Sequence, residues 1–210
     1  MSTKQPTHTR QAELVAAALA LAAERSPAEV TTAALAQAVG ITQGAVFRHF
    51  ESKEAIWLAV IDFAHQDLLA RLQAAAAAQA LPLAALRAVF MAHVDFVVEQ
   101  PGVPRVIFQE LQHPEDTPLK ARVRGLMQAY RSLLTGLLQR AQAAQLLAPG
   151  ADLQAAAVLF IGSVQGLVMQ SLLSGQVGAM RQMAPAVFDL FQQAIAAPTA
   201  KARRTQETPA

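Results

Sequence analysis

The feature that most restricts the fold of this chain is a helical spacing of apolar residues that runs almost from end to end. Apolar side chains recur three and four positions apart, as with Leu14, Ala18, Leu21 and Ala22, and no stretch alternates with the period of two that a half-buried strand needs. Alanine and leucine, which favour helices, supply most of the 53% of hydrophobic residues, and aromatic residues make up only 5%. The sequence therefore predicts an all-α fold.

Prolines, glycines and capping residues divide this pattern into about nine helices. Thr31, Thr42, Ser52, Thr117 and Asp152 each precede an apolar-periodic run and are expected to be N-caps, and Gly40 is expected to close a helix in the left-handed conformation. The expected helices cover residues 9–25, 31–39, 42–50, 53–78, 82–100, 105–112, 117–144, 152–173 and 179–197.

The helix lengths predict two domains and a tail. Residues 1–52 are expected to form a three-helix, helix-turn-helix domain, and residues 53–197 a larger helical domain. Residues 198–210, with Lys201, Arg203 and Arg204, are expected to be a disordered tail.

Composition excludes several classes of function and leaves others open. The chain has no cysteine, which excludes disulfides and thiol catalysis, and its polar N-terminus does not resemble a secretory signal, so we expect a cytoplasmic protein. The net charge is only +2, so bulk charge does not indicate nucleic acid. Residues 153–180 carry no charge and are long enough to span a membrane, but glutamines and serines interrupt them. A buried helix in a soluble dimer is the preferred interpretation, with no membrane partner.

The segment from Val30 to Val60 indicates a function. Two helices of about two turns, joined through Gly40 and Ile41, have the dimensions of a helix-turn-helix. Ala36 is small enough for the helices to approach each other. The apolar side chains expected beneath them are Leu35, Val39, Ile41, Val46 and Phe50.

This segment resembles the TetR/AcrR family of transcriptional regulators, most strongly over residues 31–60. The resemblance rests on one ordered set of residues: Thr32, Leu35-Ala36, Gly40-Ile41, Gly44, Phe47, His49-Phe50 and Ser52-Lys53-Glu54. It implies a repressor that binds a pseudo-palindromic, double-stranded operator as a homodimer and is released by a small apolar or amphipathic effector, with no cofactor.

The resemblance also implies roles for individual residues. The second short helix would enter the major groove, where glutamine suits adenine and arginine suits guanine. The residues expected to face base edges are Gln43, Gly44, Ala45 and Arg48, and those expected to hold the phosphate backbone are Thr32, Thr42, Phe47, His49 and Lys53. The sequence departs from the family where Phe47 replaces the usual tyrosine and Ala33 a frequent basic residue. Taken singly, Phe47 also fits a core position and Arg48 a solvated charge, but the complete spacing favours DNA binding.

The resemblance implies that residues 53–197 form a domain that binds a small effector and pairs two chains. Expected pocket residues are Phe96, Arg105, Phe108, Gln109, Met127, Tyr130, Gln165 and Met169, although methionine and phenylalanine at helical spacing also fit an ordinary core. Expected dimer-interface residues are Leu159, Gly162, Gly166, Leu172, Val187 and Phe191, with packing inside one chain as the alternative.

Two other functions remain open at this point. Asp62 with His65, and Glu110 with His113, place metal-capable pairs three residues apart. With Asp95 and Glu99 as further carboxylates, they could belong to a metalloenzyme or a metal-sensing regulator. The absence of a glycine-rich phosphate loop or nucleophile elbow favours a non-enzyme without a metal. Repressor and activator share the same groove-reading helix, so the sequence does not separate them.

Overall fold

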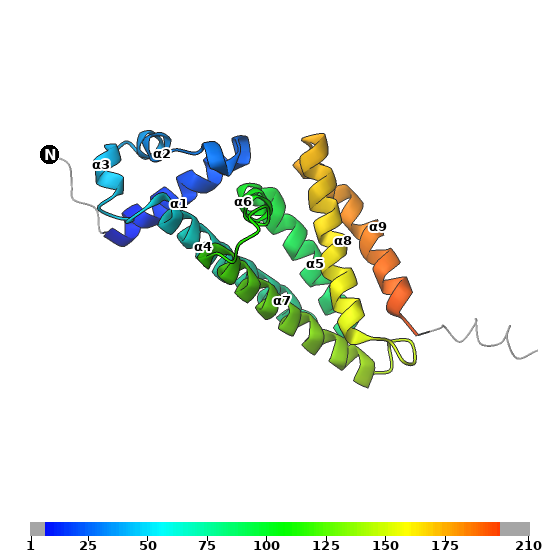
Figure 1. The fold of residues 1–210 in the computed structure, drawn as a ribbon. Coiled ribbons are helices and arrows are strands. Elements are labelled where there is room, and N and C mark those ends of the chain that lie inside the picture. The colour runs from blue at the N-terminus through cyan, green and yellow to red at the C-terminus, as the bar shows by residue number, and fades with distance from the viewer. Residues whose placement is uncertain (1–6, 198–210) are drawn as a thin grey trace, which may run out of the picture. The chain divides into compact units, whose positions relative to one another are not determined.

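The computed structural model describes residues 7–197, and its elements there are all helical. Side chains are described from Thr9 onward. The expected tail, 198–210, lies outside the described residues. Nine α-helices and two short 3-10 helices succeed one another: α1 (Thr7–Glu24), η1 (Pro27–Glu29), α2 (Thr32–Ala38), α3 (Gln43–Val46), α4 (Lys53–Ala77), α5 (Pro82–Glu99), α6 (Gly102–Glu110), α7 (Pro118–Ala143), α8 (Leu153–Ser174), η2 (Val177–Ala179) and α9 (Met180–Ile195) (Figure 1). The all-α prediction is confirmed.

Local side-chain bonds set most of the helix starts where the sequence predicts them. The hydroxyl of Thr31 accepts the amide of Ala34 at 3.1 Å, and the hydroxyl of Thr42 accepts the amide of Ala45 at 3.2 Å. Gly40 has a φ of 68°, the left-handed conformation that favours glycine at the end of α2. Ser52, Thr117 and Asp152 cap α4, α7 and α8 in the same way.

Two predicted helix bounds are wrong, each for a local reason. The helix expected over 42–50 ends at Val46, because Arg48 and His49 bond three residues back and tighten the chain into turns. The helix expected over 105–112 begins earlier, at Gly102, and Pro104 sits in its first turn, where a missing amide costs nothing. The sequence also gave no prediction of η1, which Ser26 caps.

The described residues pack as two compact units. The first comprises residues 7–70 and 96–128, and the second comprises 71–95 and 129–197, so α4, α5 and α7 each contribute to both. In the first unit α1 packs against α2 and α6, α2 packs against α3, and η1 packs against α6. In the second, α8 packs against α9.

Aromatic rings fill the core of the second unit. Phe160 of α8 lies at its centre, with its ring centroid 5.2 Å from that of Phe90 on α5 and 5.3 Å from that of Phe191 on α9. Tyr130 of α7 and Phe188 of α9 complete the cluster in edge-to-face contacts. The second unit is therefore held together by ring packing between four helices.

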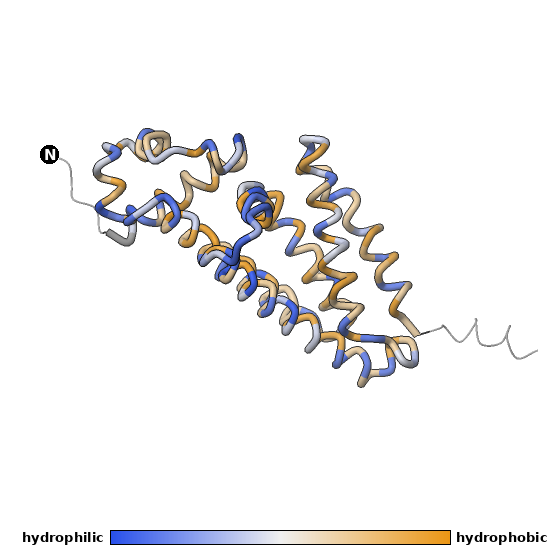
Figure 2. Tube along the Cα trace, in the orientation of Figure 1, coloured by the Kyte–Doolittle hydropathy of each residue, from blue (hydrophilic) through white to orange (hydrophobic). Residues whose placement is uncertain are grey.

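Helix α8 is long and apolar enough to cross a membrane, the one such helix in the described part of the chain. A single helix of this kind is weak evidence for a span, because core helices of soluble proteins meet the same test. Apolar positions recur along both α8 and α9 (Figure 2).

The close packing of α6 on α1 depends on Gly102. A Cβ built on Gly102 would stand 2.3 Å from the carbonyl oxygen of Leu19, a backbone atom that cannot turn aside. Gly102→Ala is therefore expected to lower the free energy of unfolding by about 1–3 kcal/mol, measured by urea denaturation.

Gly125→Ala is the matched control, because a Cβ on this glycine of α7 meets nothing within 4 Å. Its stability should be unchanged or higher by up to about 1 kcal/mol, since alanine favours the helix. Equal stability of Gly102→Ala and wild type would show that α6 does not need this close approach.

Candidate nucleic-acid interface

The α2–α3 pair stands on an apolar base in the first unit. Leu35 and Val46 are fully buried beneath the two helices, and Phe50 is 9% exposed. The amide of Ile41 bonds to the carbonyl of Ala36 at 2.9 Å, which closes the turn between them. Gln11 of α1 donates to the carbonyl of His49 at 2.9 Å, so the end of the pair is also fixed to α1.

One face of α3 and the turn that follows it carries exposed side chains. Thr42, Gln43 and Gly44 are exposed at the start of α3, and Phe47 and Arg48 are exposed after its end. Phe47 is 48% exposed although it is a large apolar residue. The Arg48 guanidinium makes no hydrogen bond or ion pair with a described residue, so it is available to a partner.

Ala45 differs from the prediction that it faces base edges. It is only 6% exposed and its methyl group belongs to the core beneath the two helices. Residues on one short helix cannot all share a face. Ala45, like the fully buried Val46, points inward, whereas Gly44 is exposed. We therefore leave it out of the exposed set.

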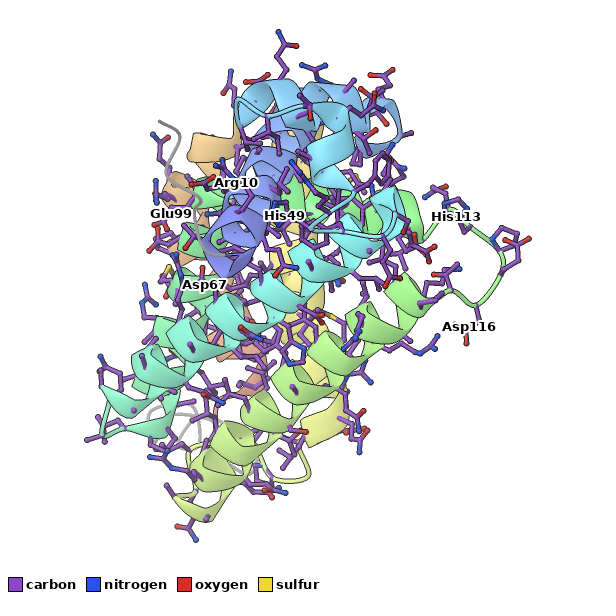
Figure 3. The ribbon with its side chains drawn as sticks, turned by 90° about the vertical axis from the view of Figure 1, so that its left-hand side faces the viewer. Arg10, His49, Asp67, Glu99, His113 and Asp116 are labelled. Carbon is purple, nitrogen blue, oxygen red and sulfur yellow. The ribbon has the colours of Figure 1, made fainter. Side chains whose placement is uncertain are left out.

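Two predicted backbone-binding side chains, those of Thr32 and Lys53, are bonded within the protein, and that of His49 is partly buried. Gln43 donates to the hydroxyl of Thr32 at 2.8 Å, which links α3 to the start of α2. The Lys53 ammonium donates to the carbonyl of Ala28 at 2.9 Å, and partial burial lowers the pKa of this lysine. The Nδ1 atom of His49 is buried without a hydrogen-bond partner, so only Nε2 remains for contact with a phosphate. His49 lies within this N-terminal region in Figure 3.

The turn before α2 is held from two sides, which the sequence did not indicate. The Gln109 side-chain oxygen on α6 accepts the amide of Ala28 at 2.9 Å and the hydroxyl of Ser26 at 3.2 Å. Lys53 of α4 holds the carbonyl of the same Ala28. Gln109 was expected to line an effector pocket, and here it joins α6 to the N-terminal helices.

The other expected pocket residues fall in both units. Phe96, Arg105, Phe108, Gln109 and Met127 lie in the first unit, and Tyr130, Gln165 and Met169 in the second. Phe96 and Tyr130 are buried, whereas Gln165 and Met169 are exposed on α8.

Tyr130 lies beside a buried histidine in the second unit. Its hydroxyl is 3.0 Å from Nδ1 of His93, and the two rings meet edge to face at 5.2 Å. Burial raises the pKa of Tyr130 and lowers that of His93 to about 4, so both groups are neutral at physiological pH.

Metal-capable side chains do not converge in this structure. Within residues 7–197, no three histidine, aspartate or glutamate side chains are placed to hold a metal ion. Asp62 pairs with Arg122 and Asp95 with Arg181, and Glu110 accepts a bond from Thr117. The geometry does not support the metal-binding alternative.

Comparison with known sequences identifies the family of this chain. The sequence model of the bacterial regulatory proteins of the TetR family matches residues 14–60, and the model of the tetracyclin repressor-like C-terminal domain matches residues 82–187. The chain belongs to the TetR family. The first match covers most of α1, α2, α3 and the start of α4, so it includes the exposed residues described above.

Two named relatives of this TetR-family chain share a moderate sequence identity with it. The nucleoid occlusion factor SlmA of Marinomonas sp. is 27% identical over 152 residues, which cover 72% of this chain and 77% of that protein. SlmA of Actinobacillus pleuropneumoniae is 31% identical over 110 residues, which cover 52% of this chain and only 54%, about half, of that protein.

Solved structures share the fold at lower identity. The transcriptional regulator FadR of Bacillus subtilis, in complex with stearoyl-CoA, has a TM-score of 0.75 at 18% identity, covering 86% of this chain and 96% of that one. A TetR transcriptional regulator from Chloroflexus aurantiacus has a TM-score of 0.75 at 22% identity, covering 90% of this chain and 98% of that one. The all-α architecture of this chain is thus that of TetR-family regulators.

The buried His93 predicts how the stability of the protein depends on pH. Because its folded pKa of about 4 lies below the ordinary value of 6.5, the unfolded chain binds the extra proton between these values. Stability should therefore fall as the pH drops from 6.5 towards 4, by at most about 3 kcal/mol from this group. Urea denaturation at several pH values measures the slope.

His93→Asn keeps a polar atom near the Tyr130 hydroxyl and should remove this part of the slope. His65→Asn, on α4, is the control and should retain it. A wild-type slope in His93→Asn would mean that another group causes the pH dependence.

Proposed function

We propose that this TetR-family chain is a ligand-responsive repressor that binds a pseudo-palindromic operator as a homodimer. The observation that carries the proposal is the exposed segment formed by α3 and the turn after it, which lies on a well-packed apolar base. In this turn Phe47 is 48% exposed and Arg48 pairs with none of the described residues. A large apolar side chain and an unpaired arginine on one exposed segment suit a partner that offers both thymine methyl groups and guanine edges.

Roles follow from the positions of these side chains. Gln43 and Arg48 would read bases, with Gly44 allowing the backbone to come close. Thr32, Thr42, Phe47, His49 and Lys53 would contact the sugar-phosphate backbone. Gln43 and Lys53 would have to exchange their present hydrogen bonds to Thr32 and Ala28 for hydrogen bonds to DNA. A change that strengthens or breaks these two internal bonds would therefore alter the affinity for DNA.

The exposed apolar face of α8 and α9 supports pairing of two chains. Leu159 is 47% exposed and Leu190 is 66% exposed, and a Cβ on Gly162 or Gly166 would meet nothing within one chain. An apolar face of this extent is typical of a protein interface. Phe191 differs from the other expected interface residues, because it is 3% exposed and packs in the aromatic core.

In the proposed mechanism, binding of an effector changes the distance between the two α3 helices of the dimer. A dimer would present its two α3 helices about one turn of DNA apart, roughly 34–36 Å. Functionally, residues 1–52 would read DNA and residues 53–197 would bind the effector and the partner chain, in the cytoplasm and without catalysis. An effector that favours another spacing would release the operator, typically with about 1–3 kcal/mol of coupling.

Selection of bound sequences from a random DNA pool tests whether α3 and the turn after it read bases. Wild type should select a palindromic motif, and Gln43→Ala and Arg48→Ala should each lose discrimination at one base position, by about 1–3 kcal/mol. Gln37→Ala, an exposed glutamine on α2, is the control and should select the wild-type motif. Salt-sensitive binding without any motif would contradict the proposal.

Sedimentation velocity tests the dimer. Leu159→Arg places a charge on the exposed face of α8 and should convert dimer to monomer while the helical circular dichroism stays unchanged. Leu111→Arg is the matched control, since Leu111 is 54% exposed but lies just after α6. A dimer that survives Leu159→Arg would place the interface elsewhere.

A further inference from the structure

The first unit contains a cavity of about 310 Å³ next to the turn that precedes α2. Its walls come from η1, the first turns of α4, the end of α6 and the start of α7. All of them belong to the same compact unit. His113, which lies on the loop between α6 and α7 in Figure 3, stands at this cavity.

Glu110 of α6 is the buried charged group of this cavity. Its side chain belongs to a residue that is only 8% exposed, and one carboxylate oxygen accepts the hydroxyl of Thr117. The other oxygen accepts no hydrogen bond from a described residue. This oxygen is not among the fully buried atoms without a partner, which are on His49 and Arg105 in the described part of the chain, so it keeps contact with solvent. It can therefore accept a hydrogen bond from a donor that enters the cavity.

The charges around the cavity favour a cation. Glu54 and Glu110 contribute two carboxylates, and the ammonium of Lys53 is already bonded to the carbonyl of Ala28 at 2.9 Å. No group of three metal-capable side chains is present in the part of the chain that the structure describes, so the cation is organic rather than a metal ion.

The remaining walls are apolar. Trp57, Val106 and Leu119 are buried and face the cavity together with Pro27. An indole ring beside a carboxylate suits a protonated amine that carries an aromatic or branched body. The volume lies at the lower end of the range for small-molecule sites, which limits the ligand to a compact one.

We propose that this cavity binds a compact, protonated organic amine through Glu110, and that its occupation weakens operator binding. The regulatory half of this proposal rests on the proposed function. Two side chains of the cavity wall, Lys53 and Gln109, are also the ones that hold Ala28 in η1. The fully buried Val30 connects η1 to Thr31, the N-cap of α2. A ligand that displaces Lys53 or Gln109 from Ala28 would therefore alter the contacts that position α2 and α3.

Trp57 provides a direct measurement, because it is the single tryptophan of the chain. Its fluorescence is followed while three probes of similar shape are added to the full-length protein: 2-phenylethylamine, 2-phenylethanol and 3-phenylpropionate. The amine is expected to bind at least about tenfold more tightly than either other probe, since the alcohol can donate only a neutral hydrogen bond to Glu110 and the anionic probe has no donor and carries a like charge. Equal responses to the three probes would overturn the site.

Glu110→Gln retains the acceptor for Thr117 and removes the charge, so it should weaken amine binding by at least about tenfold. Glu115→Gln removes an exposed carboxylate that does not line the cavity, and it should bind the amine as wild type does. Wild-type affinity in Glu110→Gln would overturn the role of Glu110. If that variant does not fold by circular dichroism, the three probes on wild type decide the question alone.

The operator recovered from the DNA selection then tests the regulatory half. Saturating 2-phenylethylamine should raise the operator dissociation constant of wild type about fivefold or more, and leave that of Glu110→Gln unchanged. Amine-selective binding with unchanged operator affinity would overturn the regulation. A selection that yields no operator would refute the proposed function, while the Trp57 titration would still decide whether the site exists.

Discussion

The packing of α6 against α1 is the contact on which the rest of the first unit depends. At Gly102 the two helices come so close that a single methyl group would collide with the carbonyl of Leu19. This approach brings the far end of α6 to the turn before α2, where Gln109 bonds to Ser26 and Ala28. A helix from the middle of the sequence thus becomes part of the support of α2 and α3.

The hydrogen bonds at η1 lie between the apolar side chains buried beneath α2 and α3 and the buried apolar side chain of α6. Val30, Leu35 and Val46 are fully buried beneath α2 and α3, and Val106 is buried on α6. Between them, η1 offers the amide and the carbonyl of one residue, Ala28, to Gln109 and Lys53. Apolar cores resist gradual deformation, whereas side-chain hydrogen bonds at a partly exposed turn exchange at low cost. Of the contacts that support α2 and α3, the hydrogen bonds at η1 are therefore the least costly to exchange.

The sequence predicts the parts of this structure that depend on neighbouring residues. Thr31 and Thr42 cap their helices, and Gly40 takes a positive φ, because each effect acts over at most four residues. The bond between Ser26 and Gln109 joins positions 83 apart, and no periodicity indicates it. Family resemblance likewise placed Ala45 among the base-facing residues, although its burial follows from the phase of a helix that is only one turn long. Which residues carry the DNA contacts stays a prediction.

Helical phase also separates two roles on α9. Ala184, Phe188, Phe191 and Ile195 recur at intervals of three and four and are all buried, whereas Met183 and Leu190, one position earlier in phase, are more than half exposed. A spacing of seven therefore joins residues on the same face, and Phe191 and Leu190 are adjacent in sequence but belong to different faces. The inner face is already satisfied by the rings of Phe160 and Phe188. Among the described residues the outer face has no such partner, and the similarly exposed Leu159 and Leu173 extend the same apolar character to α8. Exposed apolar residues that gather on one face are typical of a surface that contacts another molecule.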